Sequence, residues 1–216
     1  MFGVTLVNSL AGLLILTSLL VIEVRQPRWS AILYSLQSLV LVGIFATLAY
    51  VTKSQELYLW AASAFVMKVV LAPWILYSAL SRVGDSDKPH STFNLTLAFV
   101  MAAIAIGISF LVVSQIQLPG AAVFKPALAI SMAHFFFGEL CILTQRNIFK
   151  QVLGFCLMEN GSHLTLALLA SHAPSLVEIG IATDALFGVI IMVVLGNQIY
   201  KSLHTLDTSD LKTLKG

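Results

Sequence analysis

Apolar residues in this chain form long uninterrupted runs, without the one-residue alternation of a half-buried strand or the one-sided stripe of a surface helix. A helix needs ~20 mostly apolar residues to cross the hydrocarbon core of a bilayer. The pattern predicts about seven such helices, over residues 5–24, 29–51, 57–80, 93–116, 121–144, 148–170 and 176–200. Short segments rich in charges and turn-forming residues separate the runs, so each helix has a clear stopping point.

The composition supports an all-α, polytopic membrane protein. Of the 216 residues, 58% are hydrophobic and only 10% are charged, whereas a soluble domain carries roughly 25% charged residues. A net charge of +2 without a basic run argues against nucleic-acid binding. The sequence contains no P-loop, dinucleotide-binding or nucleophile-elbow motif, so we expect no active site of its own. Cys141 and Cys156 fall in apolar runs and are expected to be buried, inert thiols.

Basic residues predict the topology. When the loops are assigned alternately to the two sides of the membrane, only Lys53 falls clearly on one side. The other side collects Arg25, Arg28, Arg82, Lys88, Arg146, Lys150, Lys201, Lys212 and Lys215. The positive-inside rule then puts the N-terminus outside and the C-terminus in the cytoplasm. We divide the chain into a five-helix region (1–145), a two-helix region (146–200) and a cytoplasmic tail (201–216).

Four ionisable residues lie near the middle of four different predicted helices, namely Lys68, His134, Glu159 and Asp184. Their depths follow from the rise of ~1.5 Å per residue along a helix. A charge at the centre of a bilayer costs at least ~2.5 kcal/mol and usually marks a proton or ion path. These residues are therefore the first candidates for a proton relay.

Local spacing adds detail on the last two helices. Glu159 and His163 are four residues apart and share a helix face, where a carboxylate and an imidazole can exchange a proton. Gly180 and Gly188 bracket Asp184 at intervals of four, which lets another helix approach closely. We expect Asp184 to face protein rather than lipid.

The remaining candidates lie on the third and fifth helices. Pro73 cannot donate to the carbonyl of Val69, so we expect a kink with a water-accessible carbonyl beside Lys68. On the fifth helix, Lys125 either joins the relay or extends its amine to the outer boundary. His134 is either a relay group or a hydrogen-bonded packing residue. Glu139 is expected nearer the cytoplasmic surface, on a different side of the helix, as a possible entry to the path.

Several segments carry a resemblance to a known family. The runs QRNIFKQVLGFCLMENGSHLTLALL and VEIGIATDALFGVIIMVVL, with KPALAISMAHF and ASAFVMKVVL before them, resemble the hydrogenase-4 component E family of membrane subunits from formate hydrogenlyase-type complexes. The resemblance extends over essentially the whole chain. The last third is also similar to subunit K of respiratory complex I and to the related small subunit of Mrp-type antiporters. In that alignment Asp184 falls at the second membrane acid of subunit K, Cys156 falls at the first, and Glu159 follows Cys156 by three residues.

The resemblance implies a non-catalytic membrane subunit of a group 4 [NiFe]-hydrogenase complex in a prokaryotic cytoplasmic (inner) membrane. The nickel-iron site and iron-sulfur clusters would sit on partner subunits, with none on this chain. Its partners would be antiporter-like and other membrane subunits, together with the peripheral hydrogenase arm. The chain itself would continue a lateral row of protonatable groups.

Two other functions stay open on the sequence alone. One is a stand-alone secondary transporter or antiporter, in which Lys68, Glu159 and Asp184 form a substrate site. The other is a structural adaptor whose charges are locked in ion pairs, for example Lys68 with Asp184. The adaptor hypothesis predicts that removing a charge abolishes assembly, whereas the relay hypothesis predicts an assembled complex with impaired coupling.

Overall fold

The computed structural model describes residues 2–83, 95–117 and 122–212, and within these ranges the chain is helical with no strand. The helices are α1 (Phe2–Glu23), α2 (Pro27–Thr52), α3 (Gln55–Ala64), η1 (Phe65–Leu71), α4 (Ala72–Val83), α5 (Leu95–Gln115), η2 (Ala122–Phe124), α6 (Lys125–Thr144), α7 (Ile148–Leu169), α8 (Ser175–Leu203) and η3 (Asp210–Lys212). α3, η1 and α4 form one continuous rod over Gln55–Val83. Seven helical segments of the described chain are therefore long and apolar enough to cross a membrane, which confirms the predicted fold class.

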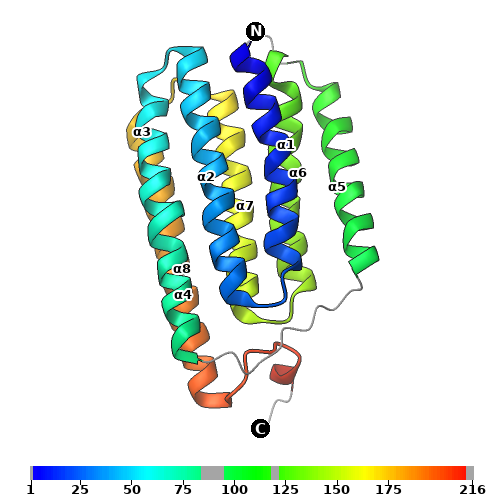
Figure 1. Cartoon of the computed structure of the whole chain (residues 1–216), viewed down its shortest axis with the longest axis vertical. Coiled ribbons are helices and arrows are strands. Elements are labelled where there is room, and N and C mark those ends of the chain that lie inside the picture. Colours follow the sequence, from blue (N-terminus) through cyan, green and yellow to red (C-terminus); the bar gives the residue numbers. More distant parts are fainter. Residues whose placement is uncertain (1, 84–94, 118–121, 213–216) are drawn as a thin grey trace.

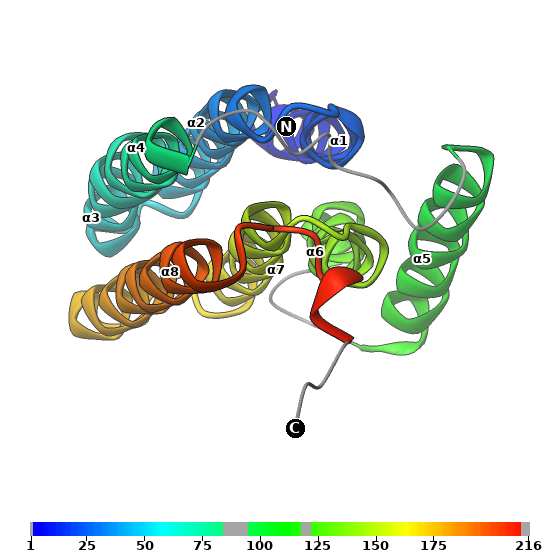
Figure 2. The same ribbon diagram turned by 90° about the horizontal axis from the view of Figure 1, so that it is seen from below.

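The helices form two facing layers (Figure 2). One layer contains the α3–η1–α4 rod, α2 and α1, and the other contains α8, α7 and α6 in matching order. α1 packs across the layers on α6, α2 packs on α7, and the rod packs on α8. α5 stands beside α6 at the end of the second layer. Two clusters of buried apolar side chains fill the space between the layers.

Glycines bring α6 and α7 into backbone contact. A Cβ atom on Gly154 would lie 2.9 Å from the carbonyl oxygen of Gly138, and one on Gly138 would overlap the backbone of Met158. A Cβ on Gly161 would similarly crowd the backbone of Phe135. Small residues at such positions let membrane helices approach closely and gain dispersion contacts. This close contact fixes the relative height of the polar side chains that α6 and α7 carry.

Polar contacts fix the end of the bundle where α1 ends and α7 begins (Figure 1). Asn147 caps α7, because its Oδ1 accepts hydrogen bonds from the backbone N–H groups of Phe149 and Lys150 at 3.0 and 3.2 Å. The ammonium of buried Lys150 donates to the carbonyl oxygens of Val21, Ile22 and Val24. It thereby satisfies two carbonyls of the last turn of α1, which have no partner within that helix, and that of Val24, which directly follows the helix.

The segment after α8 folds back onto this same end. The backbone N–H of Thr208 donates to the carbonyl of Arg146 at 2.8 Å, and that of Ile148 donates to Leu206 at 3.1 Å. The tail therefore lies on the same side of the bundle as the turn between α6 and α7. This is the relative arrangement that alternate assignment of the loops predicts.

Candidate functional site

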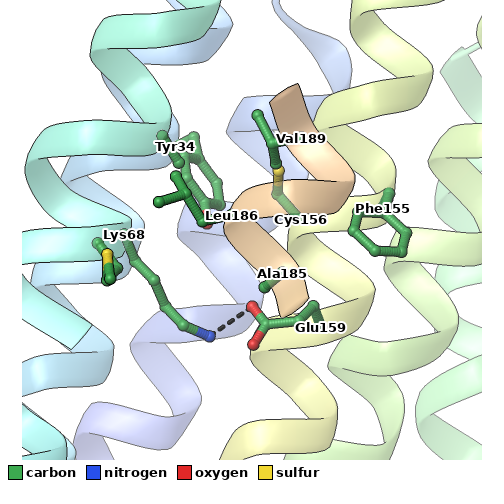
Figure 3. Close-up of a pocket in the computed structure, with 10 residues that line it drawn as sticks. Tyr34, Lys68, Phe155, Cys156, Glu159, Ala185, Leu186 and Val189 are labelled. Carbon is green, nitrogen blue, oxygen red and sulfur yellow. Dashed lines mark hydrogen bonds and ion pairs between the residues drawn. The ribbon is translucent and has the colours of Figure 1, made fainter. Parts of the chain in front are cut away.

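The central feature of the interlayer space is a buried ion pair between Lys68 of η1 and Glu159 of α7 (Figure 3). The Lys68 Nζ donates to Glu159 Oε2 and also to Asn160 Oδ1, the latter at 2.9 Å. The Lys68 residue is only 3% exposed. Two of the predicted midplane charges are thus brought together from opposite layers. The ionic partner of Lys68 is Glu159, rather than the Asp184 suggested as an example under the adaptor hypothesis.

Lys68 lies in a π-helical turn. The seven residues of η1 replace ordinary α-helical hydrogen bonding just before Pro73, whose ring nitrogen has no hydrogen to donate. The backbone N–H of Ala72 instead donates to the carbonyl of Met67, five residues back. Such wide turns inside α-helices are rare and occur frequently at functional sites.

The carbonyl of Val69 is engaged by a side chain of the neighbouring helix. It accepts a hydrogen bond of 2.7 Å from the hydroxyl of Ser35 on α2. The prediction that this carbonyl is accessible to water is therefore wrong, because the hydroxyl of Ser35 occupies it. Ser35 supplies the donor that the loss of the regular hydrogen bond leaves open, and this ties η1 to α2.

A small cavity of about 20 Å³ adjoins the ion pair. Cys156 and Phe155 of α7, Tyr34 of α2 and Ala185 of α8 line it together with the pair (Figure 3). A cavity of about 10–15 Å³ by the same measure accommodates one water molecule. The pair therefore has one water-sized opening on its α8 side. Cys156 lies on this cavity wall, one helical turn from Glu159.

His163 lies on the other side of Glu159 along α7. Its Nδ1 is 3.7 Å from Glu159 Oε1, which confirms that these two residues share a helix face. The imidazole packs edge-on against the ring of Phe45, at 5.1 Å between centroids, and at a tilt of 42° against the ring of Trp60, at 5.4 Å. The surroundings of His163 are therefore aromatic on one side and carboxylate on the other.

A chain of hydrogen bonds continues from Lys68 into the bundle. Asn160 Nδ2 donates to Gln37 Oε1 at 2.9 Å, and Gln37 Nε2 lies 3.0 Å from His134 Nε2. His134 Nδ1 lies 2.7 Å from the hydroxyl oxygen of Ser18. All four of these side chains are buried, and they alternate between the two layers of helices.

Asp184, Glu139 and Lys125 lie outside this cluster. Asp184 is exposed on α8, and among the described residues its carboxylate has no hydrogen-bond or ion-pair partner. The expectation that Asp184 faces protein is not met within this chain, since no described helix of the chain covers that face. Glu139 is half-buried beside an apolar groove between α5 and α6, and Lys125 is half-buried at the first residue of α6.

The two glycines beside Asp184 differ. A Cβ on Gly188 would lie 3.2 Å from the ring of Phe155 on α7, whereas nothing of the described chain lies within 4 Å of one on Gly180. Gly188 therefore allows close approach inside the chain. Gly180 leaves open space on the same outer stretch of α8 that carries Asp184.

Gln37, Asn160 and Ser18 were not predicted as parts of the site, because only charged and imidazole side chains were considered as candidates. Gln37 and Asn160 each stand in an apolar run at about the depth of the charges. A buried amide must also find hydrogen-bond partners, so the depth rule applied to amides would have found both residues. Lys150 was counted only among the basic residues of the cytoplasmic side, whereas it is buried against the end of α1.

The cysteines agree with expectation, since Cys141 and Cys156 are both buried and free. Among the residues that the structure describes, no three metal-binding side chains come together. Within the described chain, the candidate chemistry is therefore carried by the ion pair and the hydrogen-bonded side chains around it.

Comparison with known proteins gives a consistent result. The family model for NADH-ubiquinone/plastoquinone oxidoreductase chain 4L matches residues 126–216, which include α7, α8 and all but the first residue of α6. The chain is 49% identical to hydrogenase-4 component E of Escherichia coli (strain K12) and to that of Shigella flexneri, over 100% of each chain. An uncharacterised protein of Mycobacterium tuberculosis is 23% identical over 213 residues, which is 97% of this chain and 96% of that protein. No solved structure matches the chain. At this identity over its full length, the chain belongs to the hydrogenase-4 component E family.

Proposed function

We propose that this chain is an integral membrane subunit of a [NiFe]-hydrogenase complex of formate hydrogenlyase type, in which it forms part of a proton path. The family relationship supports the complex, since the relatives are components of hydrogenase-4. The match to oxidoreductase chain 4L supports a place among membrane subunits of complex I-like architecture. The nickel-iron site and the iron-sulfur clusters belong to partner subunits in this proposal.

The buried pair of Lys68 and Glu159 is the observation that carries the proton path. Its two groups come from opposite layers and adjoin a water-sized cavity, and Lys68 lies in a π-helical turn. Breaking a buried pair by removing one partner costs about 3–5 kcal/mol, and hydrophobic residues of similar volume are often equally stable there. A pair that is so costly to break and contributes little net stability is better explained by chemistry than by packing.

The chemistry is a change in the number of protons that the pair holds. In the resting pair the ammonium is hydrogen-bonded to the carboxylate, and the net charge is zero. A proton that arrives through the cavity binds Glu159 Oε2 and breaks the ion pair, while Asn160 Oδ1 keeps its hydrogen bond to Lys68. Lys68 then carries an uncompensated positive charge, which favours release of a proton from the cluster.

Asp184 is the next group in this proposal. It precedes the cavity-lining Ala185 by one position on α8 but is exposed on the outer face of the chain. An unpaired carboxylate facing lipid is costly, so a neighbouring membrane subunit that supplies a donor or a cation is the expected cover. The open space at Gly180 allows a helix of that subunit to approach closely.

The proposed orientation follows the positive-inside rule. The junctions of α1 with α2 and of α6 with α7 lie at the end of the bundle to which the tail returns, and they carry Arg25, Arg28, Arg146 and Lys150. We assign that end to the cytoplasm of a prokaryotic inner membrane and the start of α1 to the outside.

The structural-adaptor hypothesis is the second candidate, because an ammonium that donates to both Glu159 and Asn160 is also what a permanently locked ion pair requires. The two functions differ in what the loss of charge does. An adaptor loses assembly when Glu159 is neutralised, whereas a relay keeps assembly and loses translocation.

The test is a Glu159→Gln variant in the tagged complex, purified in mild detergent and also prepared in inverted membrane vesicles. We expect co-purification of the nickel-iron subunit, hydrogen evolution from an artificial reductant at the wild-type rate, and proton translocation reduced by about 10²-fold or more. Glu56→Gln is the matched control, because Glu56 lies in the first turn of α3 and accepts a hydrogen bond from Ser54. Wild-type translocation in Glu159→Gln would refute the path, and loss of the subunit from the complex would favour the adaptor.

A further inference from the structure

The hydrogen-bond chain that leads away from Lys68 has a single direction. An ammonium can only donate hydrogen bonds, so the group of Asn160 that faces Lys68 must be its carbonyl oxygen. The amide nitrogen of Asn160 then points onward and donates to Gln37 Oε1. The amide nitrogen of Gln37 in turn points at His134 Nε2, which must accept.

The other end of the chain gives the same direction independently. The single hydroxyl hydrogen of Ser18 is donated to the backbone carbonyl of Leu14, in the same helix. The Ser18 oxygen therefore accepts from His134, and His134 Nδ1 must carry a hydrogen. An imidazole with hydrogen on Nδ1 and an accepting Nε2 is neutral. The two ends thus agree on one protonation state for a histidine that is 0% exposed.

We propose that Asn160, Gln37, His134 and Ser18 form a one-directional hydrogen-bond chain that holds the charged Lys68 in place as the hydrogen-bond donor to Glu159. The hydrogen bonds hold His134 as the neutral tautomer with its hydrogen on Nδ1. His134 is therefore a positioning residue and carries no transferred proton. The functional consequence rests on the function proposed above, whereas the tautomer of His134 does not.

The hydrogen-bond chain acts on Lys68 electrostatically. Each donor points away from Lys68 and each acceptor points toward it, so the amide and imidazole dipoles add in the direction that stabilises a positive charge on Lys68. Chained hydrogen bonds also polarise one another in a low-dielectric interior. The hydrogen bonds run from α7 through α2 and α6 to α1. They therefore tie the position of Lys68 to four helices other than its own.

The direct test is the protonation state of His134. The full-length chain, with its five histidines labelled with ¹⁵N, is reconstituted in lipid nanodiscs at neutral pH. The His134 signals are assigned by their absence from a His134→Gln variant. We expect a protonated Nδ1 and an unprotonated Nε2. An imidazolium, or the tautomer with hydrogen on Nε2, would overturn the proposal.

A second test compares two substitutions of His134 in the assembled complex. Glutamine keeps one acceptor and one donor but cannot carry a proton, whereas leucine removes both. We expect His134→Leu to lower proton translocation about 5-fold to 100-fold, the range for two lost buried hydrogen bonds, and His134→Gln to restore most of it. Hydrogen evolution from an artificial reductant should be unchanged in both variants. Equal loss in the two variants would mean that His134 itself transfers protons, which would overturn the proposal.

These outcomes separate the proposal from the proposed function. If Glu159→Gln translocates normally while His134 shows hydrogen on Nδ1, the proton path fails and the hydrogen-bond chain stands. If Glu159→Gln abolishes translocation while His134 is an imidazolium, the path stands and the one-directional chain fails.

Discussion

α7 and α8 each place a carboxylate within the membrane-spanning region, yet the two acids have opposite surroundings. Glu159 on α7 is paired with Lys68 of the opposite layer and is enclosed by side chains of this chain. Asp184 on α8 is exposed, with no partner among the residues that the structure describes. The first acid is therefore completed within this fold, whereas the proposed function assigns the cover of the second acid to a neighbouring subunit.

The same contrast separates the glycines around the two acids. Gly154, on the α6-facing side of α7, is packed against backbone, whereas Gly180 on α8 has open space. Substitutions inside the bundle should therefore change the stability of the isolated chain. Substitutions on the outer face of α8 should not destabilise the isolated chain, and any loss that they cause should appear only when other subunits are present.

The largest effect is expected for Lys68→Met. It leaves the Glu159 carboxylate buried without a cation, which should lower the stability of the purified chain by about 3–5 kcal/mol. Lys68→Met combined with Glu159→Met should recover most of that loss, since the double variant leaves no charge at this site. The measurement is reversible unfolding of the chain in mixed micelles. Equal stability of Lys68→Met and the wild type would show that the pair contributes nothing in the folded chain.

Gly154→Ala should have the next largest effect, about 1–3 kcal/mol of lost stability, because the added methyl group is forced against α6. Gly180→Ala is the matched control. In the isolated chain it should be neutral or stabilise by up to about 1 kcal/mol, as expected for glycine replaced in an open helix. In the assembled complex it should weaken association if a neighbouring helix packs there. Parallel melting curves of the chain and the complex distinguish these cases.

Ser35→Ala should cost about 0.5–1.5 kcal/mol, because the carbonyl of Val69 loses its donor on α2. Ser35→Thr keeps the hydroxyl and serves as the control. Hydrogen exchange of the backbone amides in 65–72 reports the effect locally. Faster exchange confined to that turn is the predicted result, and unchanged exchange would mean that Ser35 does not hold the π-helical turn.

The smallest effect on the isolated chain is expected for Asp184→Asn, below about 0.5 kcal/mol, as for other exposed positions. Its effect should appear in the complex, as reduced proton translocation with hydrogen evolution preserved. A destabilised isolated chain would show that Asp184 has a partner within this fold, and the contrast with Glu159 would disappear.

The sequence was sufficient to predict the helices, because crossing a bilayer requires long apolar runs that end at charges and turn formers. The predicted 57–80 and the observed Gln55–Val83 differ by only a few residues at each end. The π-helical turn was not predicted, since Pro73 indicates a disturbance without fixing its form. The layer arrangement is a matter of lateral packing, for which hydropathy gives no signal.

The candidate site was predicted in part. Counting residues along each helix predicted the same membrane depth for Lys68, Glu159 and His134. The structure joins all three through hydrogen bonds of Asn160 and Gln37. The pairing of Lys68 with Glu159 instead of Asp184 depends on how α7 and α8 rotate about their axes. That rotation is set by contacts such as those of glycines on α6 and α8 with α7, which no single-helix pattern contains.

The most direct measurement of the central claim is difference infrared spectroscopy of the assembled complex, recorded between the resting state and turnover. The account predicts a carbonyl-stretch band of a newly protonated carboxyl group that appears during turnover, is present in the Glu56→Gln control and is absent from Glu159→Gln. If no such band depends on Glu159, the carboxylate stays locked to Lys68 throughout turnover, and the exchange of protons at this pair is contradicted.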